Sequence, residues 1–413
     1  MGYLLRRGVA EIIVEEELLR LLDSGRRLRL KQGFDPSCPD IHLGHVVGLR
    51  KLRQFQERGH QVVLIVGDWT AQIGDPSGES ATRTMLSREE VHANAETYME
   101  QFFKVVDREK TEVRWQSEWF SRFNLDDILK LTSRFTVAQF LAREDFDKRY
   151  KGGRPIAITE LLYPLLQAYD SVVIEADVEF GGMDQKFNCL VGRELQTMRG
   201  QPPQQVFLVP LLLGTDGRQK MSKSLGNYIA IDEPPKEMYG KVMSIPDHLL
   251  LDYFELLTDV SGGELEGFEQ QLNSQSVNPM LLKKRLAREI VAQFHSVEAA
   301  EEAELGFERE VQRRELPKEL PEYAYDLVFE EADSSSSALI DISRMLSHLN
   351  LVKSRAEARR LVDQGAVEVN GVKATEVIDA RSFGNTFTIK FGKRRSAKIR
   401  LTTREAQKEL PNR

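Results

Sequence analysis

A strand–helix–strand pattern between residues 28 and 67 constrains the fold of this chain more than any other feature. Two segments, Leu28–Phe34 and Gln61–Gly67, have the composition of short strands, and the second contains five consecutive aliphatic residues. Such a run is typical of a strand buried on both faces of a parallel sheet. Between them, Val46–Arg58 has apolar residues at helical spacing and is followed by Gly59 as a C-cap. We therefore expect a right-handed βαβ unit within an α/β, doubly wound parallel sheet.

Two histidines follow the first expected strand, in the segment Asp40–His45. His42 and His45 are three residues apart at the start of a helix and share one face, and Gly44 between them lets a ligand approach the backbone. A helix N-terminus offers unpaired N–H groups and the positive end of a dipole, which suits a phosphate. The pattern therefore fits a nucleoside triphosphate held against two imidazoles. Two surface histidines are the commoner interpretation of so short a motif.

Two later loops also follow expected strands. The strand-like run Val172–Phe180 leads into Gly181–Gln185, where paired glycines permit close approach and Asp184 could accept from ribose hydroxyls or simply cap a helix. The strand Gln205–Leu213 leads into a loop that contains Lys220–Ser224. Its two ammonium groups could close over a triphosphate and stabilise departing pyrophosphate, although loop lysines are usually just solvated. Loops at the carboxyl ends of parallel strands can converge on one crevice.

A helix expected over Thr159–Tyr169 has a polar face. Tyr163, Gln167 and Asp170 are spaced four and three residues apart, so a phenol, an amide and a carboxylate point the same way. They could bind a small polar ligand, although an ordinary amphipathic helix with a solvated polar side is the commoner case. The surrounding leucines leave little of this helix exposed, which favours the ligand.

Charge is distributed unevenly along the 413 residues. The chain has a net charge of −7, but residues 339–413 contain 16 basic and 8 acidic residues, a surplus of eight positive charges. The remainder therefore carries −15, and a basic tail on an acidic body indicates a polyanionic partner. The two cysteines, Cys38 and Cys189, argue against disulfides or a zinc site. No apolar run reaches the length of about 20 residues that spans a membrane, and we expect a cytoplasmic protein.

Composition also suggests where the domains lie. We expect a nucleotide-binding domain over residues 1–230, with an insertion at about 112–154 whose apolar faces could serve a dimer contact or pack on the body. An α-helical domain would follow over 231–320. Proline and serine mark a linker at 321–338, and a small α+β domain would occupy 339–413.

The His-x-Gly-His and Lys-Met-Ser-Lys-Ser strings together resemble the signatures of class I aminoacyl-tRNA synthetases, which have a Rossmann-like catalytic domain; Leu43 replaces the usual isoleucine. Four further strings are similar to the bacterial tyrosyl-tRNA synthetases. They are Gly33-Phe34-Asp35-Pro36, Gly74-Asp75-Pro76-Ser77-Gly78, Tyr163-x-x-x-Gln167-Ala168-Tyr169-Asp170 and Gly181-Gly182-x-Asp184-Gln185. The tail is similar to an RNA-binding domain first described in a small-subunit ribosomal protein.

The resemblance implies a ligase that activates L-tyrosine with ATP to tyrosyl-adenylate and pyrophosphate, then transfers tyrosine to the 3′ end of its tRNA. The implied catalytic residues are His42, His45, Lys220 and Lys223. The implied ATP-binding residues are Gly44, Arg83, Gly181, Gly182, Asp184 and Lys223. Mg²⁺ is expected to arrive with ATP, without a tightly bound protein metal. The resemblance also implies a homodimer.

Further roles follow from the same resemblance. The residues implied for tyrosine binding are Asp35, Asp75, Tyr163, Gln167, Asp170 and Gln185. Those implied for tRNA binding lie in or next to the tail helix Ser354–Gln364 and are Lys353, Arg355, Arg359 and Arg360. One position departs from the family pattern. In the better-known branch, a tyrosine two residues before the Gly-Phe-Asp glycine also touches the substrate hydroxyl, and here that position is Lys31.

Three alternatives remain open on the sequence. The tryptophanyl relatives share the fold, but the polar face of the helix and the basic tail favour tyrosine. A synthetase-like RNA-binding protein without catalysis is disfavoured by the intact histidines and lysines. A small nucleotidyltransferase shares His-x-Gly-His, but the length and the tail disfavour it.

Overall fold

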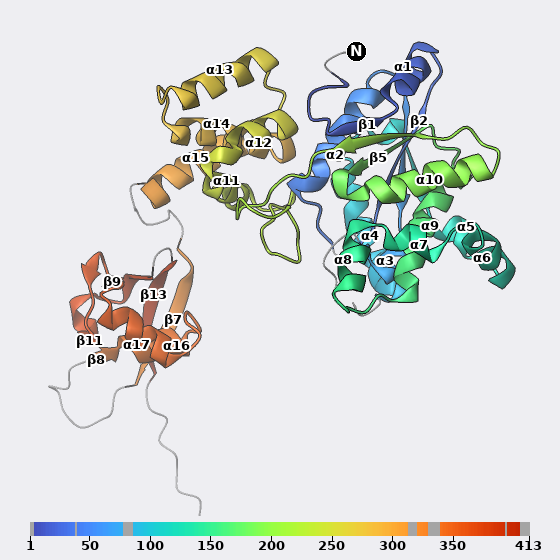
Figure 1. Ribbon diagram of the computed structural model, residues 1–413. Coiled ribbons are helices and arrows are strands. Elements are labelled where there is room, and N and C mark those ends of the chain that lie inside the picture. The colour runs from blue at the N-terminus through green and yellow to red at the C-terminus, as the bar shows by residue number, and fades with distance from the viewer. Residues whose placement is uncertain are drawn as a thin grey trace, which may run out of the picture. The chain divides into compact units, whose positions relative to one another are not determined.

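The structure is a computed structural model that describes residues 4–37, 39–76, 86–312, 320–328, 339–392 and 395–404. The chain forms two compact units, residues 1–304 and 305–413 (Figure 1). The sequence analysis instead placed boundaries at residues 230, 320 and 338. The helical segment after residue 230 belongs to the first unit, because helix α12 (Leu250–Leu257) packs against helix α2 (Leu43–Gln56) of the nucleotide fold.

A six-stranded sheet forms the centre of the first unit, in the order β1-β6-β5-β2-β3-β4. Its strands are β1 (Glu11–Ile13), β2 (Arg29–Phe34), β3 (Gln61–Val66), β4 (Thr111–Trp115), β5 (Val178–Gly182) and β6 (Gln205–Val209). Among these strands β1 runs antiparallel to β6, and the other neighbours are parallel. The predicted doubly wound sheet is thus confirmed, with an unpredicted antiparallel edge.

The order of the strands creates a topological switch point. From β2 the chain adds β3 and β4 on one side, and later adds β5 and β6 on the other side. A crevice opens at the carboxyl ends of the strands at such a point. The crossover helices are α2 (Leu43–Gln56), α4 (Arg88–Phe102), α9 (Ile158–Val173) and α10 (Lys186–Met198), with the shorter α1 (Glu15–Asp23) and α3 (Thr70–Ile73) beside them.

The expected insertion begins later than the sequence suggested. Residues 112–115, which it included, belong to β4, an edge strand that pairs with β3. The insertion itself comprises α5 (Ser117–Phe120), α6 (Leu125–Thr132), α7 (Val137–Leu141) and α8 (Glu144–Lys151). The strand expected over Val172–Phe180 is also shorter, because α9 continues to Val173 and β5 starts only at Val178.

The remaining helices of this part are α11 (Pro235–Ser244), α12 (Leu250–Leu257), α13 (Gly262–Asn273), α14 (Pro279–Phe294) and α15 (Val297–Phe307). Helix α14 packs against both α11 and α12. No helix within the described ranges is long and apolar enough to cross a membrane.

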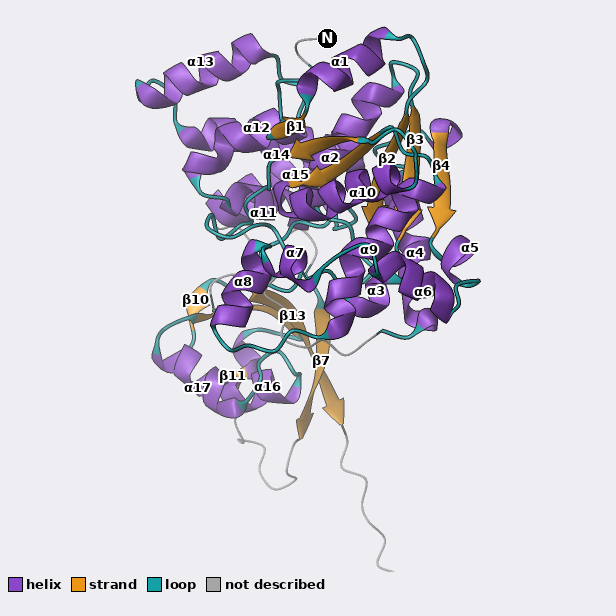
Figure 2. Ribbon diagram, turned by 45° about the vertical axis from the view of Figure 1, so that its right-hand side comes forward, coloured by secondary structure: helices purple, strands orange, loops and turns teal. Residues whose placement is uncertain are grey.

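The second unit contains a five-stranded sheet, β10-β9-β12-β13-β7, and a two-stranded sheet, β11-β8. Its elements are β7 (Glu322–Val328), β8 (Leu339–Asp341), α16 (Ile342–His348), α17 (Arg355–Asp363), β9 (Val367–Val369), β10 (Val372–Lys373), β11 (Val377–Asp379), β12 (Thr386–Phe391) and β13 (Arg395–Arg404). Strands β9 and β10 form a hairpin that turns at Asn370-Gly371, and both residues have the positive φ that such a turn needs (47° and 82°). Strand β7 occupies part of the expected linker and pairs in parallel with β13 (Figure 2).

Candidate active site

A cavity of about 740 Å³, here called the central cavity, lies at the carboxyl ends of β2, β5 and β6. The sequence analysis had expected a ligand crevice at this place. The implied site residues that line it are Asp35, His42, Gly44, His45, Asp75, Tyr163, Gln167, Asp170, Gly181, Gly182, Asp184, Gln185, Lys220 and Lys223. Arg83 lies outside the described residues. The structure therefore brings together residues that are up to 188 positions apart in the chain.

The two imidazoles form one stacked unit at the start of α2. Their ring centroids are 3.9 Å apart. Nδ1 of His42 accepts from the backbone N–H of Gly44 (3.2 Å), and Nδ1 of His45 accepts from that of His42 (3.3 Å). A Cβ on Gly44 would lie 3.0 Å from the His42 ring, so a glycine is needed there. Because each Nδ1 is an acceptor, the proton of each neutral ring is assigned to Nε2, which remains a donor.

Both imidazoles are neutral near physiological pH. Burial lowers the pKa of His42 to about 3, and the nearby Lys223 and Lys220 lower it further in the same direction. Burial and the neighbouring His42 hold the pKa of His45 well below its ordinary value. The pair can therefore donate hydrogen bonds to a phosphate without carrying charge of its own.

The lysine-bearing loop lies on the same side of the cavity as the histidines. Lys220 forms an ion pair with Asp184 (2.7 Å), and Lys223 donates to the hydroxyl of Tyr98 on α4 (2.8 Å). The segment after the loop is anchored to the histidines, because His42 pairs with Ala230 in a β-bridge. Both cations thus already face polar groups that a nucleotide could replace.

Asp170 marks the other end of the cavity. It is 2% exposed, and its carboxylate accepts from Nε2 of Gln116 (2.9 Å) and Nε1 of Trp119 (3.2 Å). Burial raises the pKa of Asp170 to about 7, against the opposing effect of the Lys31 ammonium. A buried carboxylate with two neutral donors retains capacity to accept a hydrogen bond from a ligand hydroxyl.

Acidic and amide groups lie between these two ends. Tyr163 donates its hydroxyl proton to Asp35 (2.7 Å), which also accepts from Thr70 (2.7 Å). Gln185 donates to Asp75 (2.5 Å). Two carboxylates within reach of a phenol and amides suit an ammonium group.

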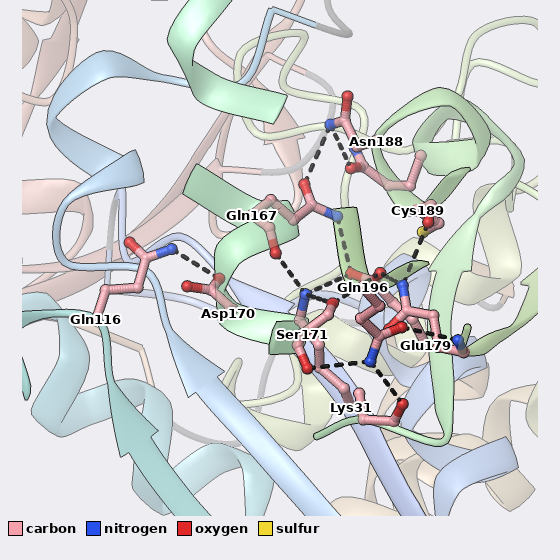
Figure 3. A network of polar contacts seen from close by, with 12 residues as sticks. Lys31, Gln116, Gln167, Asp170, Ser171, Glu179, Asn188, Cys189 and Gln196 are labelled. Atoms are coloured by element: carbon pink, nitrogen blue, oxygen red, sulfur yellow. Dashed lines mark hydrogen bonds and ion pairs between the residues drawn. The ribbon is translucent and has the colours of Figure 1, made fainter. Parts of the chain in front are cut away.

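Lys31 is absent from the cavity lining among the described residues. Its side chain is buried behind the cavity in an ion pair with Glu179, 2.8 Å apart (Figure 3). Gln116 does line the cavity beside Asp170. The sequence analysis missed Gln116, Trp119 and Glu179, because none of them stands in a recognisable motif.

The four tail residues implied for tRNA binding lie in or beside one helix, α17. Lys353, Arg355, Arg359 and Arg360 are all exposed, while Ala358 and Val362 of the same helix pack into the core of the unit. Arg355 is additionally held by Asp341 at 2.6 Å. Within the described residues, no cluster of three or more His, Cys, Asp or Glu side chains could hold a metal ion.

Comparison with known proteins gives consistent matches. The sequence model described as tRNA synthetases class I (W and Y) matches residues 23–312, and that of the S4 domain matches residues 343–377. The chain is 60% identical to a tyrosine–tRNA ligase of Dehalococcoides mccartyi, covering 96% of this chain and 97% of that protein. It is 50% identical to a tyrosine–tRNA ligase of Carboxydothermus hydrogenoformans, covering 96% of both chains. A tyrosyl-tRNA synthetase structure from Archaeoglobus fulgidus, complexed with L-tyrosine, matches with a TM-score of 0.60 and 25% identity over 73% of this chain and 98% of that one.

Proposed function

Since this chain belongs to the tyrosine–tRNA ligases among the class I tRNA synthetases, we propose that its central cavity holds tyrosine and ATP together and that its second unit binds the tRNA. The chain is an aminoacyl-tRNA synthetase that activates L-tyrosine with ATP and transfers it to tRNA. The assignment of roles to individual residues rests on the geometry of the cavity. The observation that carries it is that one cavity encloses the imidazole pair, the lysine loop and the buried Asp170.

The triphosphate would lie between the imidazoles and the lysine loop. Nε2 of His42 and His45 would donate to phosphate oxygens, and Lys220 and Lys223 would bind the pyrophosphate as it leaves. On ATP binding, Asp184 would release its ion-pair partner Lys220 and accept hydrogen bonds from the ribose hydroxyls instead. Mg²⁺ would enter with ATP, bound mostly by phosphate oxygens.

The glycines of β5 leave room for the nucleotide. A Cβ on Gly182 would lie 2.7 Å from Oδ1 of Asp184, and a Cβ on Gly181 would lie 2.9 Å from Cβ of Gln185. Larger residues would therefore displace the side chains assigned to ribose and tyrosine. We assign Arg83 to a further phosphate contact on the resemblance alone, since it lies outside the described residues.

The chemistry needs no covalent bond to the protein. An oxygen of the tyrosine carboxylate attacks the α-phosphorus of ATP, and the bond to the β-phosphate oxygen breaks to release pyrophosphate. A ribose hydroxyl at the 3′ end of tRNA then attacks the carbonyl carbon, and AMP leaves. The protein contributes positioning and stabilisation of charge that develops on phosphate oxygens.

Asp170 would accept a hydrogen bond from the phenol hydroxyl of tyrosine in the cavity. Phenylalanine would leave this buried acceptor without its ligand partner, which carries a free-energy penalty. Tyrosyl-tRNA synthetases are themselves the standard example of such rejection, at about 10⁵-fold, a value that belongs to the family and not to this structure. Tyr163, Gln167 and Gln185, with Asp35 and Asp75, would hold the ammonium and carboxylate ends of the substrate.

Tyrosine-dependent exchange of pyrophosphate into ATP tests this function, with tryptophan and phenylalanine as controls. The family description covers both the tryptophan and the tyrosine branches, so the tryptophan control decides between them. We expect exchange with tyrosine and none above background with the other two. Exchange with tryptophan alone, or with no amino acid, would refute the proposal.

The tRNA would bind the exposed basic helix of the second unit. Lys353, Arg355, Arg359 and Arg360 offer charges to an RNA backbone. A cytoplasmic location stays a prediction that rests on the tRNA substrate.

We also propose that the insertion mediates a homodimer. Five large apolar side chains between residues 125 and 158 are 58–80% exposed, namely Leu125, Leu129, Val137, Tyr150 and Ile158. Leu125 and Leu129 lie one turn apart on α6, and exposed apolar side chains that gather on one face are typical of an interaction surface. Sedimentation velocity should show a dimer that Leu125→Asp, in helix α6 of the insertion, dissociates. A monomeric wild-type protein would refute the dimer.

A further inference from the structure

Two opposite charges lie side by side in the middle of the main sheet. Lys31 on β2 and Glu179 on β5 are direct partners in the strand register, and their side chains are 0% and 1% exposed. Removing two charges from water costs several kcal/mol per ion, and well-packed apolar residues often replace such a pair without loss of stability. The pair therefore calls for an explanation other than stability of the fold.

The pair contacts one residue of the tyrosine site from both sides. Nζ of Lys31 donates to the backbone carbonyl of Gln167 and to the hydroxyl of Ser171, both at 2.7 Å. The carboxylate of Glu179 accepts from Nε2 of Gln167 at 3.1 Å. Oε1 of Gln167 in turn accepts from Asn188 at 3.1 Å. Glu179 and Asn188 thus fix the two ends of the Gln167 side-chain amide, while Lys31 fixes its backbone carbonyl (Figure 3).

The same pair acts electrostatically on Asp170, one residue before Ser171 on α9. Burial raises the pKa of Asp170, the ammonium of Lys31 is the main opposing influence, and Glu179 raises the pKa again. Neutral donors, Gln116 and Trp119, contribute in the same direction as Lys31. The charged or titratable groups that interact with Asp170 are Lys31 on β2, Glu179 on β5 and Tyr163 on α9, and Tyr163 in turn interacts with Asp35 and Asp75.

We propose that the Lys31–Glu179 ion pair is the positioning device of the tyrosine site, holding the backbone carbonyl and the side-chain amide of Gln167 in place for the substrate and setting the electrostatic environment of the neighbouring Asp170. The inference rests on the proposed function of the cavity. It makes Lys31 and Glu179 positioning residues that never touch the substrate.

Three variants and one control test this inference in the full-length enzyme. The variants are Lys31→Met, Glu179→Gln and the double variant. The control is Lys51→Met, because Lys51 is also a buried lysine but donates to the carbonyl of Leu4 and lies outside the central cavity lining. Pyrophosphate exchange gives KM and kcat for tyrosine and KM for ATP across a pH series, and thermal unfolding confirms that each variant is folded.

We expect Lys31→Met to raise the KM for tyrosine by about 10- to 100-fold, as for loss of a charge-assisted contact, and to leave the KM for ATP nearly unchanged. The pH at which kcat/KM for tyrosine reaches half its maximum should rise in Lys31→Met and fall in Glu179→Gln. In the double variant it should return toward the wild-type value. A purely structural role would move both single variants in the same direction.

Several results would overturn the inference. The first is an equal rise in KM for tyrosine and for ATP. The second is a pair of single variants whose pH midpoints of kcat/KM do not move in opposite directions. The third is the same rise in KM for tyrosine in Lys51→Met. If Lys31→Met does not fold, the Glu179→Gln and double-variant midpoints decide the question. Failure of the wild-type enzyme to use tyrosine at all would instead refute the proposed function.

Discussion

Replacing Asp170 with asparagine tests the tyrosine end of the cavity most sharply. The substitution keeps the size of the side chain but removes the charge that would accept the substrate phenol. A charge-assisted hydrogen bond contributes about 1.5–3 kcal/mol, so kcat/KM for tyrosine should fall about 10- to 150-fold. The value for phenylalanine should change little, because that substrate has no hydroxyl to lose.

The pH dependence of kcat/KM for tyrosine gives a second, independent test. Burial raises the pKa of Asp170 to about 7, so the wild-type kcat/KM for tyrosine should fall as the pH drops below neutrality. Asp170→Asn has no proton to take up at this position. Its profile should therefore lack this decline, and the two enzymes should differ most at alkaline pH.

The raised pKa of Asp170 also predicts how the free energy of unfolding of the ligand-free enzyme changes with pH. The folded state holds the Asp170 proton up to about pH 7, whereas the unfolded chain releases it near the ordinary value of 3.8. The folded state therefore binds more protons between these values, and the wild type loses stability relative to Asp170→Asn as the pH rises. The full slope is about 1.36 kcal/mol per pH unit, and it flattens as the folded-state group titrates, so the loss between about pH 5 and pH 7 is about 2 kcal/mol.

Urea unfolding at several pH values, together with pyrophosphate exchange, would measure these quantities. Three outcomes would contradict the reasoning. They are an unchanged discrimination between tyrosine and phenylalanine, a variant with the wild-type pH profile, and a stability difference that does not vary with pH.

Two further predictions concern the nucleotide loop and the tail. Lys223→Met should lower kcat for exchange about 100-fold or more with little change in the KM for tyrosine, because its ammonium stabilises the leaving pyrophosphate; a change in KM alone would argue against that role. Ending the chain at Gln312 should preserve tyrosine-dependent exchange but lower kcat/KM for tRNA charging by about tenfold or more, since the basic helix is lost. This cut also avoids leaving β7 without its partner β13, which a cut at 338 would do. Intact charging by the truncated enzyme would refute the RNA-binding assignment.

The parts of the fold with strong periodicity could be predicted from the sequence. The aliphatic run of β3 and the amphipathic α2 identified the parallel sheet. Strand β1 was missed because three residues carry too little pattern. Strand β4 was assigned to the insertion because an edge strand with partly exposed polar residues resembles a surface segment.

The candidate site was predictable where short motifs mark it. Its supporting residues were not, because Gln116 and Asn188 are lone amides whose neighbours are set by tertiary packing. Lys31 and Glu179 did leave a signal that was not used. Each is a charged residue within an expected strand, and a charge inside a buried strand requires a partner on a neighbouring strand.

A crystal structure with a non-hydrolysable tyrosyl-adenylate analogue tests the central claim most directly. The account predicts that the phenol oxygen lies within hydrogen-bond distance of Asp170, with the ribose at Asp184 and the phosphate group facing the imidazoles. An analogue bound outside this cavity, or reversed so that its phenol lies beside the lysine loop, would contradict it.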